Sequence, residues 1–143
     1  ASPAALSRGS PRPLWSFFCG IGNELAPLAD AHVPLSKIYA ADCSEYAIRT
    51  YARAARKHFP RVPVALCGDM LDDTGPVAWT DEAVRNRLDR EGLPIIVAGW
   101  PCNGHAGANR NAHGTHAFDH ASTAMLMILA RILAAVKDWM NAH

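Results

Sequence analysis

Continuous apolar stretches alternate with stretches of helical periodicity along this chain. The apolar stretches, each short enough for one buried strand, are residues 14–19, 37–42, 64–67 and 95–99. Each is followed by a segment expected to form a helix. In the second and the last of these segments, the last covering residues 122–141, apolar residues recur at helical spacing. Apolar strands that alternate with helices are typical of a parallel sheet covered on both faces. The pattern therefore predicts an α/β fold, an open and mostly parallel sheet of about four strands with flanking helices.

Capping residues predict where the middle helices begin and end. Ser44 and Thr80 are favourable N-cap residues, and Asp81 and Glu82 suit the positive end of a helix dipole. Gly92 is expected to end the helix that Thr80 begins. The buried faces predicted from helical spacing are Ala47, Ile48, Tyr51 and Ala55 in one helix and Met125, Ile128, Leu129, Ile132, Val136 and Trp139 in the last.

Composition indicates one globular domain. The 143 residues are 50% apolar and 19% charged with a formal net charge of +1, so the chain can form a core and has no general attraction to polyanions. Residues 1–13 are rich in proline and serine and are expected to be a flexible leader, and residues 14–143 to form the domain. No apolar stretch approaches the roughly 20 residues of a membrane span. Four scattered cysteines favour a reducing compartment over a disulfide framework.

Glycine and aspartate residues follow the predicted strands, at the edge where parallel sheets bind ligands. A Gly-x-Gly turn at 20–22 precedes a helix expected over residues 23–31 and lets a ligand approach the backbone closely. Asp42 ends the second strand, where a carboxylate can bind ribose hydroxyls, and Asp69 follows the third, where one can accept from an adenine amino group. Two acids around this turn suit a cationic adenosine ligand such as S-adenosylmethionine. Equally, each acid could cap the helix or turn that follows it.

A cysteine begins the long loop that follows the fourth strand. Residues 100–116 show no periodicity and are rich in glycine, asparagine and histidine. Pro101 fixes the backbone before Cys102, so the thiol is expected at the ligand edge, where it is placed as a nucleophile. The cysteines expected to serve packing, because they lie in or beside apolar strands, are Cys19, Cys43 and Cys67.

Four segments together resemble successive motifs of the DNA cytosine-5 methyltransferases. They are LWSFFCGIGNELAPL, YAADCSEYAIRTY, CGDM and VAGWPCNGHAGANR, in the family's order and spacing between Leu14 and Arg110. The Pro-Cys-Asn form at 101–103 is similar to that of the animal de novo enzymes. The resemblance implies the Rossmann-like open sheet of S-adenosylmethionine-dependent methyltransferases, of which this chain would form the first half.

The resemblance also implies a role for each motif residue. Asp42 would hold the ribose of the cofactor, Asp69 its adenine, and Cys102 would be the catalytic thiol. The residues that would border S-adenosylmethionine are Phe18, Gly20, Ile21, Gly22, Asp42, Cys43, Asp69, Met70 and Pro101. The residues that would contact the cytosine or the DNA are Asn103, Gly104, Asn109 and Arg110. No residue is expected to bind a metal.

The implied reaction is transfer of the methyl group of S-adenosylmethionine to C5 of cytosine. Addition of the Cys102 thiolate to C6 makes C5 nucleophilic enough to attack the methyl group, and loss of the C5 proton then releases the enzyme. Because the ring cannot be reached inside a duplex, the implied substrate is double-stranded DNA with the cytosine flipped out. Gly104, Gly107 and Gly114 would be hinges of a loop that closes over the base.

Parts of the family pattern are altered or missing. Asn23 stands where the family usually has a second glycine, and His105 and Ala106 stand where it often has Phe and Ser. Downstream of the Pro-Cys motif, the family's Glu-Asn-Val motif, whose glutamate engages the cytosine ring, its later Arg-x-Arg motif and its target-recognition region do not occur. We therefore expect the N-terminal half of a catalytic domain, completed by a C-terminal half or a complementary subunit. By itself the chain should bind the cofactor weakly and methylate DNA poorly.

The remaining features have plainer interpretations, and other functions stay open. The loop histidines fit no compact zinc pattern and are expected to face solvent or DNA: His105, His113, His116 and His120. The basic residues of one helix are expected to form a solvated face: Arg49, Arg53, Arg56, Lys57 and Arg61.

Two alternative functions stay open. One is a non-catalytic relative that binds cofactor or a partner. The other is a nicotinamide-dependent oxidoreductase, which is disfavoured because Leu25 replaces the third glycine of the dinucleotide-binding pattern. A methyltransferase would be cytoplasmic and nucleoid-associated in a bacterial or viral setting, and nuclear in a eukaryote.

Overall fold

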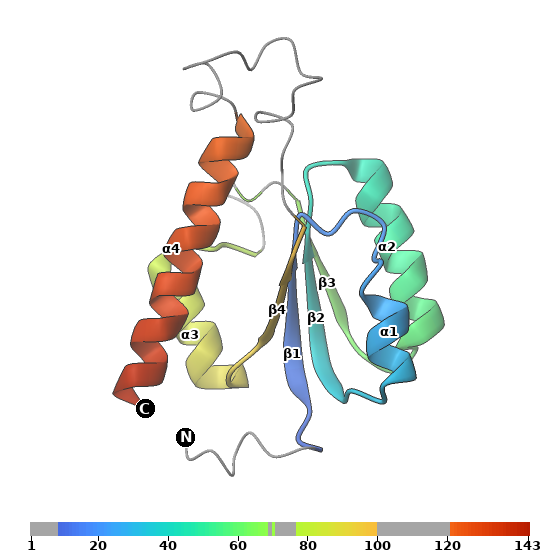
Figure 1. Cartoon of the computed structure of the whole chain (residues 1–143), viewed down its shortest axis with the longest axis horizontal. Coiled ribbons are helices and arrows are strands. Elements are labelled where there is room, and N and C mark those ends of the chain that lie inside the picture. Colours follow the sequence, from blue (N-terminus) through green and yellow to red (C-terminus); the bar gives the residue numbers. More distant parts are fainter. Residues whose placement is uncertain (1–8, 69, 71–76, 100–120) are drawn as a thin grey trace.

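A computed structural model describes residues 9–68, 70, 77–99 and 121–143, whose strands and helices alternate along the chain (Figure 1). The strands are β1 (Arg12–Phe17), β2 (Leu35–Ala41), β3 (Val64–Cys67) and β4 (Ile95–Ala98). The helices are α1 (Leu25–Asp30), α2 (Glu45–His58), α3 (Asp81–Glu91) and α4 (Ala121–Ala142). The α/β alternation predicted from apolar periodicity is therefore confirmed.

The described strands form one parallel sheet in the order β3-β2-β1-β4. β1 is central, since Leu14 lies opposite Ile38 of β2 and also opposite Ile95 of β4. Because every pairing is parallel, the carboxyl ends of the strands meet at one edge. The chain proceeds outward from β1 to β3 and then returns to the other side of β1 as β4. The strand order therefore reverses at the boundary between β1 and β4, where open parallel sheets bind their ligands.

Helices cover both faces of the sheet, as the apolar strands predict. α1 and α2 lie on one face, and α3 and α4 lie on the other (Figure 1). Successive side chains of β1 point to opposite faces: Leu14 packs in the core beneath α1 and α2, whereas Trp15 and Phe17 pack in the core beneath α3 and α4. Each face of the sheet therefore has its own hydrophobic core.

The predicted helix caps are confirmed, and the predicted buried faces are confirmed in part. Ser44 Oγ accepts a hydrogen bond from the backbone N–H of Ala47 at 3.2 Å, and Thr80 Oγ1 accepts one from Ala83 at 3.2 Å. α3 ends at Gly92, whose φ of 85° suits glycine. The buried members of the predicted faces are Ala47, Tyr51 and Ala55 in α2 and Leu129, Ile132 and Val136 in α4, whereas the half-buried members are Ile48, Met125, Ile128 and Trp139.

Several predicted boundaries and burial states differ from the structure. β1 begins at Arg12, whose backbone N–H donates to the Pro34 oxygen at 3.3 Å, so residues 12 and 13 belong to the sheet and not to a leader. α1 begins at Leu25 and not at residue 23, because its N–H closes the glycine turn by donating to the Gly22 oxygen at 3.1 Å. β4 is half-buried where full burial was expected, since among the described strands only β1 pairs with it.

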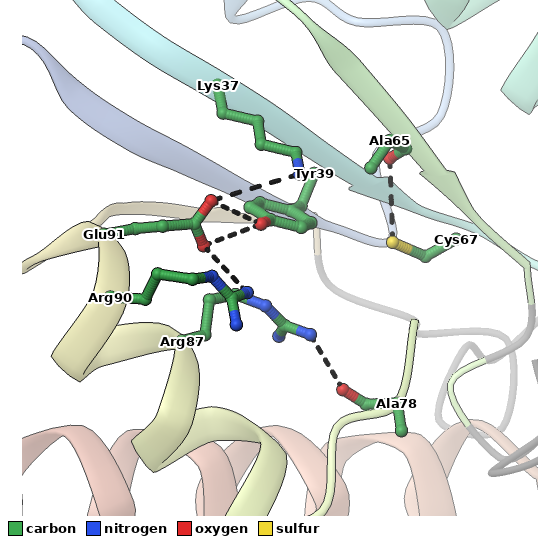
Figure 2. Close-up of polar contacts among 8 residues, drawn as sticks. All are labelled: Lys37, Tyr39, Ala65, Cys67, Ala78, Arg87, Arg90 and Glu91. Carbon is green, nitrogen blue, oxygen red and sulfur yellow. Dashed lines mark hydrogen bonds and ion pairs between the residues drawn. The ribbon is translucent and has the colours of Figure 1, made fainter. Parts of the chain in front are cut away.

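A buried arginine that sequence analysis did not single out joins α3 to the sheet. Arg87 is 6% exposed, and its Nη2 donates to the Ala78 oxygen at 3.1 Å. Its guanidinium carbon lies 4.4 Å from the ring centre of Trp79 and 4.8 Å from that of Tyr39. The Tyr39 hydroxyl in turn donates to the Glu91 carboxylate at 2.6 Å (Figure 2). Burial lowers the pKa of Arg87, and the aromatic rings partly replace the water it has lost.

Candidate functional site

The chain leaves β1 through a strained turn that contains both predicted glycines. Phe18 and Gly20 each have φ of 53°, and Gly22 has φ of 85°. The left-handed region is ordinary for glycine but unfavourable for phenylalanine. A Cβ at Gly22 would lie 3.0 Å from Leu25 Cδ1 and 3.1 Å from Tyr51 Cδ2, so the turn packs tightly on the helices. Strain at Phe18 that the surrounding structure maintains is a common property of functional sites.

Asp42 connects the end of β2 to this turn. Its Oδ2 accepts a hydrogen bond from the Gly20 N–H at 2.9 Å, and its Oδ1 accepts one from the Ser44 N–H at 2.9 Å. The second bond closes a local turn, as expected if Asp42 caps the segment that follows it. The first is a contact between distant segments, and each oxygen keeps a lone pair for a ligand hydroxyl. The structure thus brings the predicted acid to the predicted glycine turn.

A pocket of about 580 Å³ lies beside the turn, at the β1–β4 boundary. Its volume falls within the range of roughly 300–1,000 Å³ typical of small-molecule sites. One wall is Gly99, whose N–H donates to the Phe17 oxygen at 3.0 Å. A Cβ at Gly99 would lie only 2.6 Å from the Phe18 backbone oxygen. Only glycine therefore allows the end of β4 to approach the turn this closely.

The pocket contains a charged group that sequence analysis missed. Glu24, half-buried directly before α1, lines the pocket, and Ser16 Oγ and the Tyr51 hydroxyl both donate to its Oε1. The Tyr51 bond is 3.0 Å long, and burial together with Glu24 raises the pKa of Tyr51, so its hydroxyl stays protonated as a donor. A tyrosine on a predicted buried face needs a hydrogen-bond partner, which is the signal that could have indicated Glu24.

The structure brings some of the predicted site residues together and separates others. Phe18, Gly20 and Ile21 line the pocket. Cys43 is exposed beside Asp42, whereas Met70 is 4% exposed and packs in the core beneath α3 and α4. The predicted residues that lie outside the described part of the chain are Asp69, Pro101, Cys102, Asn103, Gly104, Asn109 and Arg110.

The described site is a pocket at the β1–β4 boundary, the switch point at which the strand order of the parallel sheet reverses. A glycine turn and an acid lie at its edge. No protein-family model matches the chain, and no curated protein does. The geometry of the pocket and the order of the sequence motifs are therefore what support a function.

The cysteines of the described residues differ in environment. Burial, with the Asp42 and Glu24 carboxylates as lesser causes, raises the pKa of Cys19 to about 12, and burial raises that of Cys67 to about 11. Both thiols are therefore protonated at neutral pH and are poor nucleophiles. Cys19 lies beyond the end of β1 and Cys67 within β3, and both pack as expected. The packing role expected for Cys43 is wrong, because its side chain is exposed.

Other predicted surface features can be compared with the described residues. In that part of the chain, no group of three or more His, Cys, Asp or Glu side chains is placed to hold a metal, and the loop histidines lie outside it. None of its helices is long and apolar enough to cross a bilayer. The predicted solvated face of α2 and the residues after it is confirmed, since its members are all exposed: Arg49, Arg53, Arg56, Lys57 and Arg61.

Proposed function

We propose that this chain is the cofactor- and nucleophile-bearing part of a DNA cytosine-5 methyltransferase that uses S-adenosylmethionine. The observation that carries the proposal is the 2.9 Å hydrogen bond from the Gly20 N–H to Asp42 Oδ2 at the edge of the pocket. It joins an acid suited to ribose hydroxyls to a turn suited to close approach of a ligand, at the switch point of the sheet. The order of the sequence motifs adds the nucleophile and the type of substrate.

The groups at this edge fit S-adenosylmethionine. A Cβ at Gly20 would meet no atom within 4 Å, so a ligand has free access to the backbone there. Asp42 keeps acceptor capacity for the ribose, and the pocket beside Phe18 and Ile21 has the volume of a small-molecule site. When bound, S-adenosylmethionine supplies the methyl group. The residues of this chain bind and orient it.

Cys102 is the nucleophile of the proposal. It follows Gly99 by three residues in the sequence. Gly99 is hydrogen-bonded to Phe17 beside the pocket, and three residues span at most about 10 Å, so this separation along the sequence is compatible with the proposed role. The proposed role of this thiol is to add to C6 of a flipped-out cytosine.

Ligand titrations followed by NMR test the cofactor part of the proposal. S-adenosylmethionine should shift the amide resonances of residues 18–22 and 42–44, and NAD should not. Asp42→Asn removes the charge and an acceptor, so it should weaken the affinity about tenfold. Asp138→Asn, an exposed acid on α4, is the matched control and should leave affinity unchanged. Binding of NAD in preference to S-adenosylmethionine would favour the oxidoreductase and contradict the proposal.

Covalent trapping tests the nucleophile. Duplex DNA that contains 5-fluorocytosine, incubated for hours with the chain and S-adenosylmethionine, should form an adduct that persists on a denaturing gel. Because the adduct accumulates, the assay detects chemistry too slow for a turnover measurement. Cys102→Ala should abolish the adduct, and Cys43→Ala, which removes an exposed thiol, should not. Cofactor binding without any adduct would indicate the non-catalytic relative instead.

A further inference from the structure

Glu24 gives the pocket a negative charge. Among the described residues that line the pocket, it is the only Asp, Glu, Lys, Arg or His. Cys19 also lines it, but its raised pKa keeps that thiol neutral. No described Lys, Arg or His forms an ion pair with Glu24. A half-buried carboxylate without a counter-ion favours a cationic partner, because a cation offsets the cost of its lost hydration.

The carboxylate is fixed by bonds to one of its two oxygens. Ser16 Oγ and the Tyr51 hydroxyl both donate to Oε1, and both donors are buried, at 1% and 0% exposure. Oε2 accepts no hydrogen bond from the described residues. Ser16 lies on β1, Tyr51 on α2 and Glu24 directly before α1, so three segments orient one acceptor beside the pocket. Oε2 is therefore the oxygen left for a ligand.

We propose that Glu24 Oε2 binds a cationic amine of the pocket's ligand, namely the ammonium group of the amino-acid portion of S-adenosylmethionine. This inference rests on the function proposed above and assigns a residue to one part of its cofactor. An ammonium group carries three N–H donors, which match an acceptor with unused lone pairs. A sulfonium centre carries charge but no donor, so it gains less from an oriented oxygen. Charge-assisted hydrogen bonds of this kind are among the stronger polar contacts in proteins.

Glu24→Gln isolates the proposed interaction. The amide oxygen of glutamine can still accept from Ser16 and Tyr51, whereas the negative charge and the second acceptor are lost. Three ligands are compared: S-adenosylmethionine, S-adenosylhomocysteine, which keeps the ammonium but has a neutral sulfur, and 5′-methylthioadenosine, which lacks the amino-acid portion. Glu82→Gln, an exposed acid in the first turn of α3, is the matched control for net charge.

Glu24→Gln should weaken binding of S-adenosylmethionine and S-adenosylhomocysteine about 10- to 100-fold. The affinity for 5′-methylthioadenosine should change less than about twofold, since that ligand presents no ammonium. Glu82→Gln should bind all three ligands as the wild type does. Affinities come from NMR titration, which also shows from the amide spectrum that each variant is folded.

The remaining outcomes overturn the inference or the function separately. Unchanged affinity of Glu24→Gln for both ammonium ligands, with wild-type binding intact, overturns the inference and leaves the proposed function in place. If Glu24→Gln loses affinity for S-adenosylmethionine alone, Glu24 interacts with the sulfonium. If it loses affinity equally for all three ligands, Glu24 maintains the shape of the turn. Either result overturns the inference. Failure of the wild type to bind either ammonium ligand overturns the proposed function, and the inference with it.

Discussion

Single backbone positions set the geometry of the site. At Gly99 the chain approaches the Phe18 oxygen so closely that a Cβ would lie 2.6 Å from it. At Gly20 a Cβ would meet open space, and glycine is favoured there because the backbone φ is 53°. The turn at Gly20 was predictable because a Gly-x-Gly pattern after a strand is typical of a ligand-binding turn. It gave Gly99 no role, because close packing between two segments leaves no local signal.

Gly99→Ala should destabilise the protein, because the new methyl group forces the end of β4 away from the turn. We expect the free energy of unfolding to fall by about 1–3 kcal/mol, the usual cost of overpacking. Urea denaturation followed by circular dichroism measures it. Gly68→Ala is the control: a Cβ there meets nothing within 4 Å, so its effect should stay within about 0.5 kcal/mol. Equal effects of the two substitutions would contradict the steric argument.

At the scale of elements, α3 is attached to the sheet by a buried cation as well as by apolar contacts. Arg87 packs against the rings of Trp15, Tyr39 and Trp79, while its Nε and Nη1 find no hydrogen-bond partner among the described residues. A buried charge with unused donors contributes more through the volume of its side chain than through its charge. The helix itself was predicted from the residues at its two ends. The burial of Arg87 was not predicted, because it results from contacts between α3 and the sheet and not from the sequence of the helix alone.

Substitutions at Arg87 separate the volume of the side chain from its charge. Arg87→Ala leaves a cavity among aromatic rings and should lower the free energy of unfolding by about 2–4 kcal/mol. Arg87→Met fills most of the same space and should cost less than about 1 kcal/mol. Arg85→Ala, an exposed position on α3, controls for helix propensity. If urea denaturation shows methionine to be as harmful as alanine, the charge and not the packing attaches α3.

At the scale of the whole molecule, the sheet separates two cores, and each contains a buried thiol. Cys19 packs beneath α1 and α2, and Cys67 beneath α3 and α4. Their pKa values are raised from 9.0 to about 12 and about 11, chiefly by burial. Below pH 9 these thiols are protonated in both the folded and the unfolded chain. As the pH rises further, only the unfolded chain releases these protons, so unfolding becomes more favourable.

The free energy of unfolding should therefore fall between about pH 9 and about pH 11, by up to roughly 1.4 kcal/mol per pH unit for each thiol. Urea denaturation across this range measures the slope. Cys67→Ala should make the slope shallower, whereas Cys43→Ala removes an exposed thiol and should leave it unchanged. Stability that stays constant or rises over this interval would show that the two thiols ionise equally in both states.

Local patterns of residues were enough to predict the elements and part of the site. Apolar spacing and capping residues act within a few positions of each other, so they specified the alternation of strands and helices, the caps at Ser44 and Thr80, and the glycine turn near Asp42. The strand order β3-β2-β1-β4, and with it the pocket at the β1–β4 boundary, came from packing between distant segments. The same packing brings Ser16 and Tyr51 to Glu24 and buries Arg87. These features depend on contacts between segments far apart in the chain, which no local pattern of residues specifies.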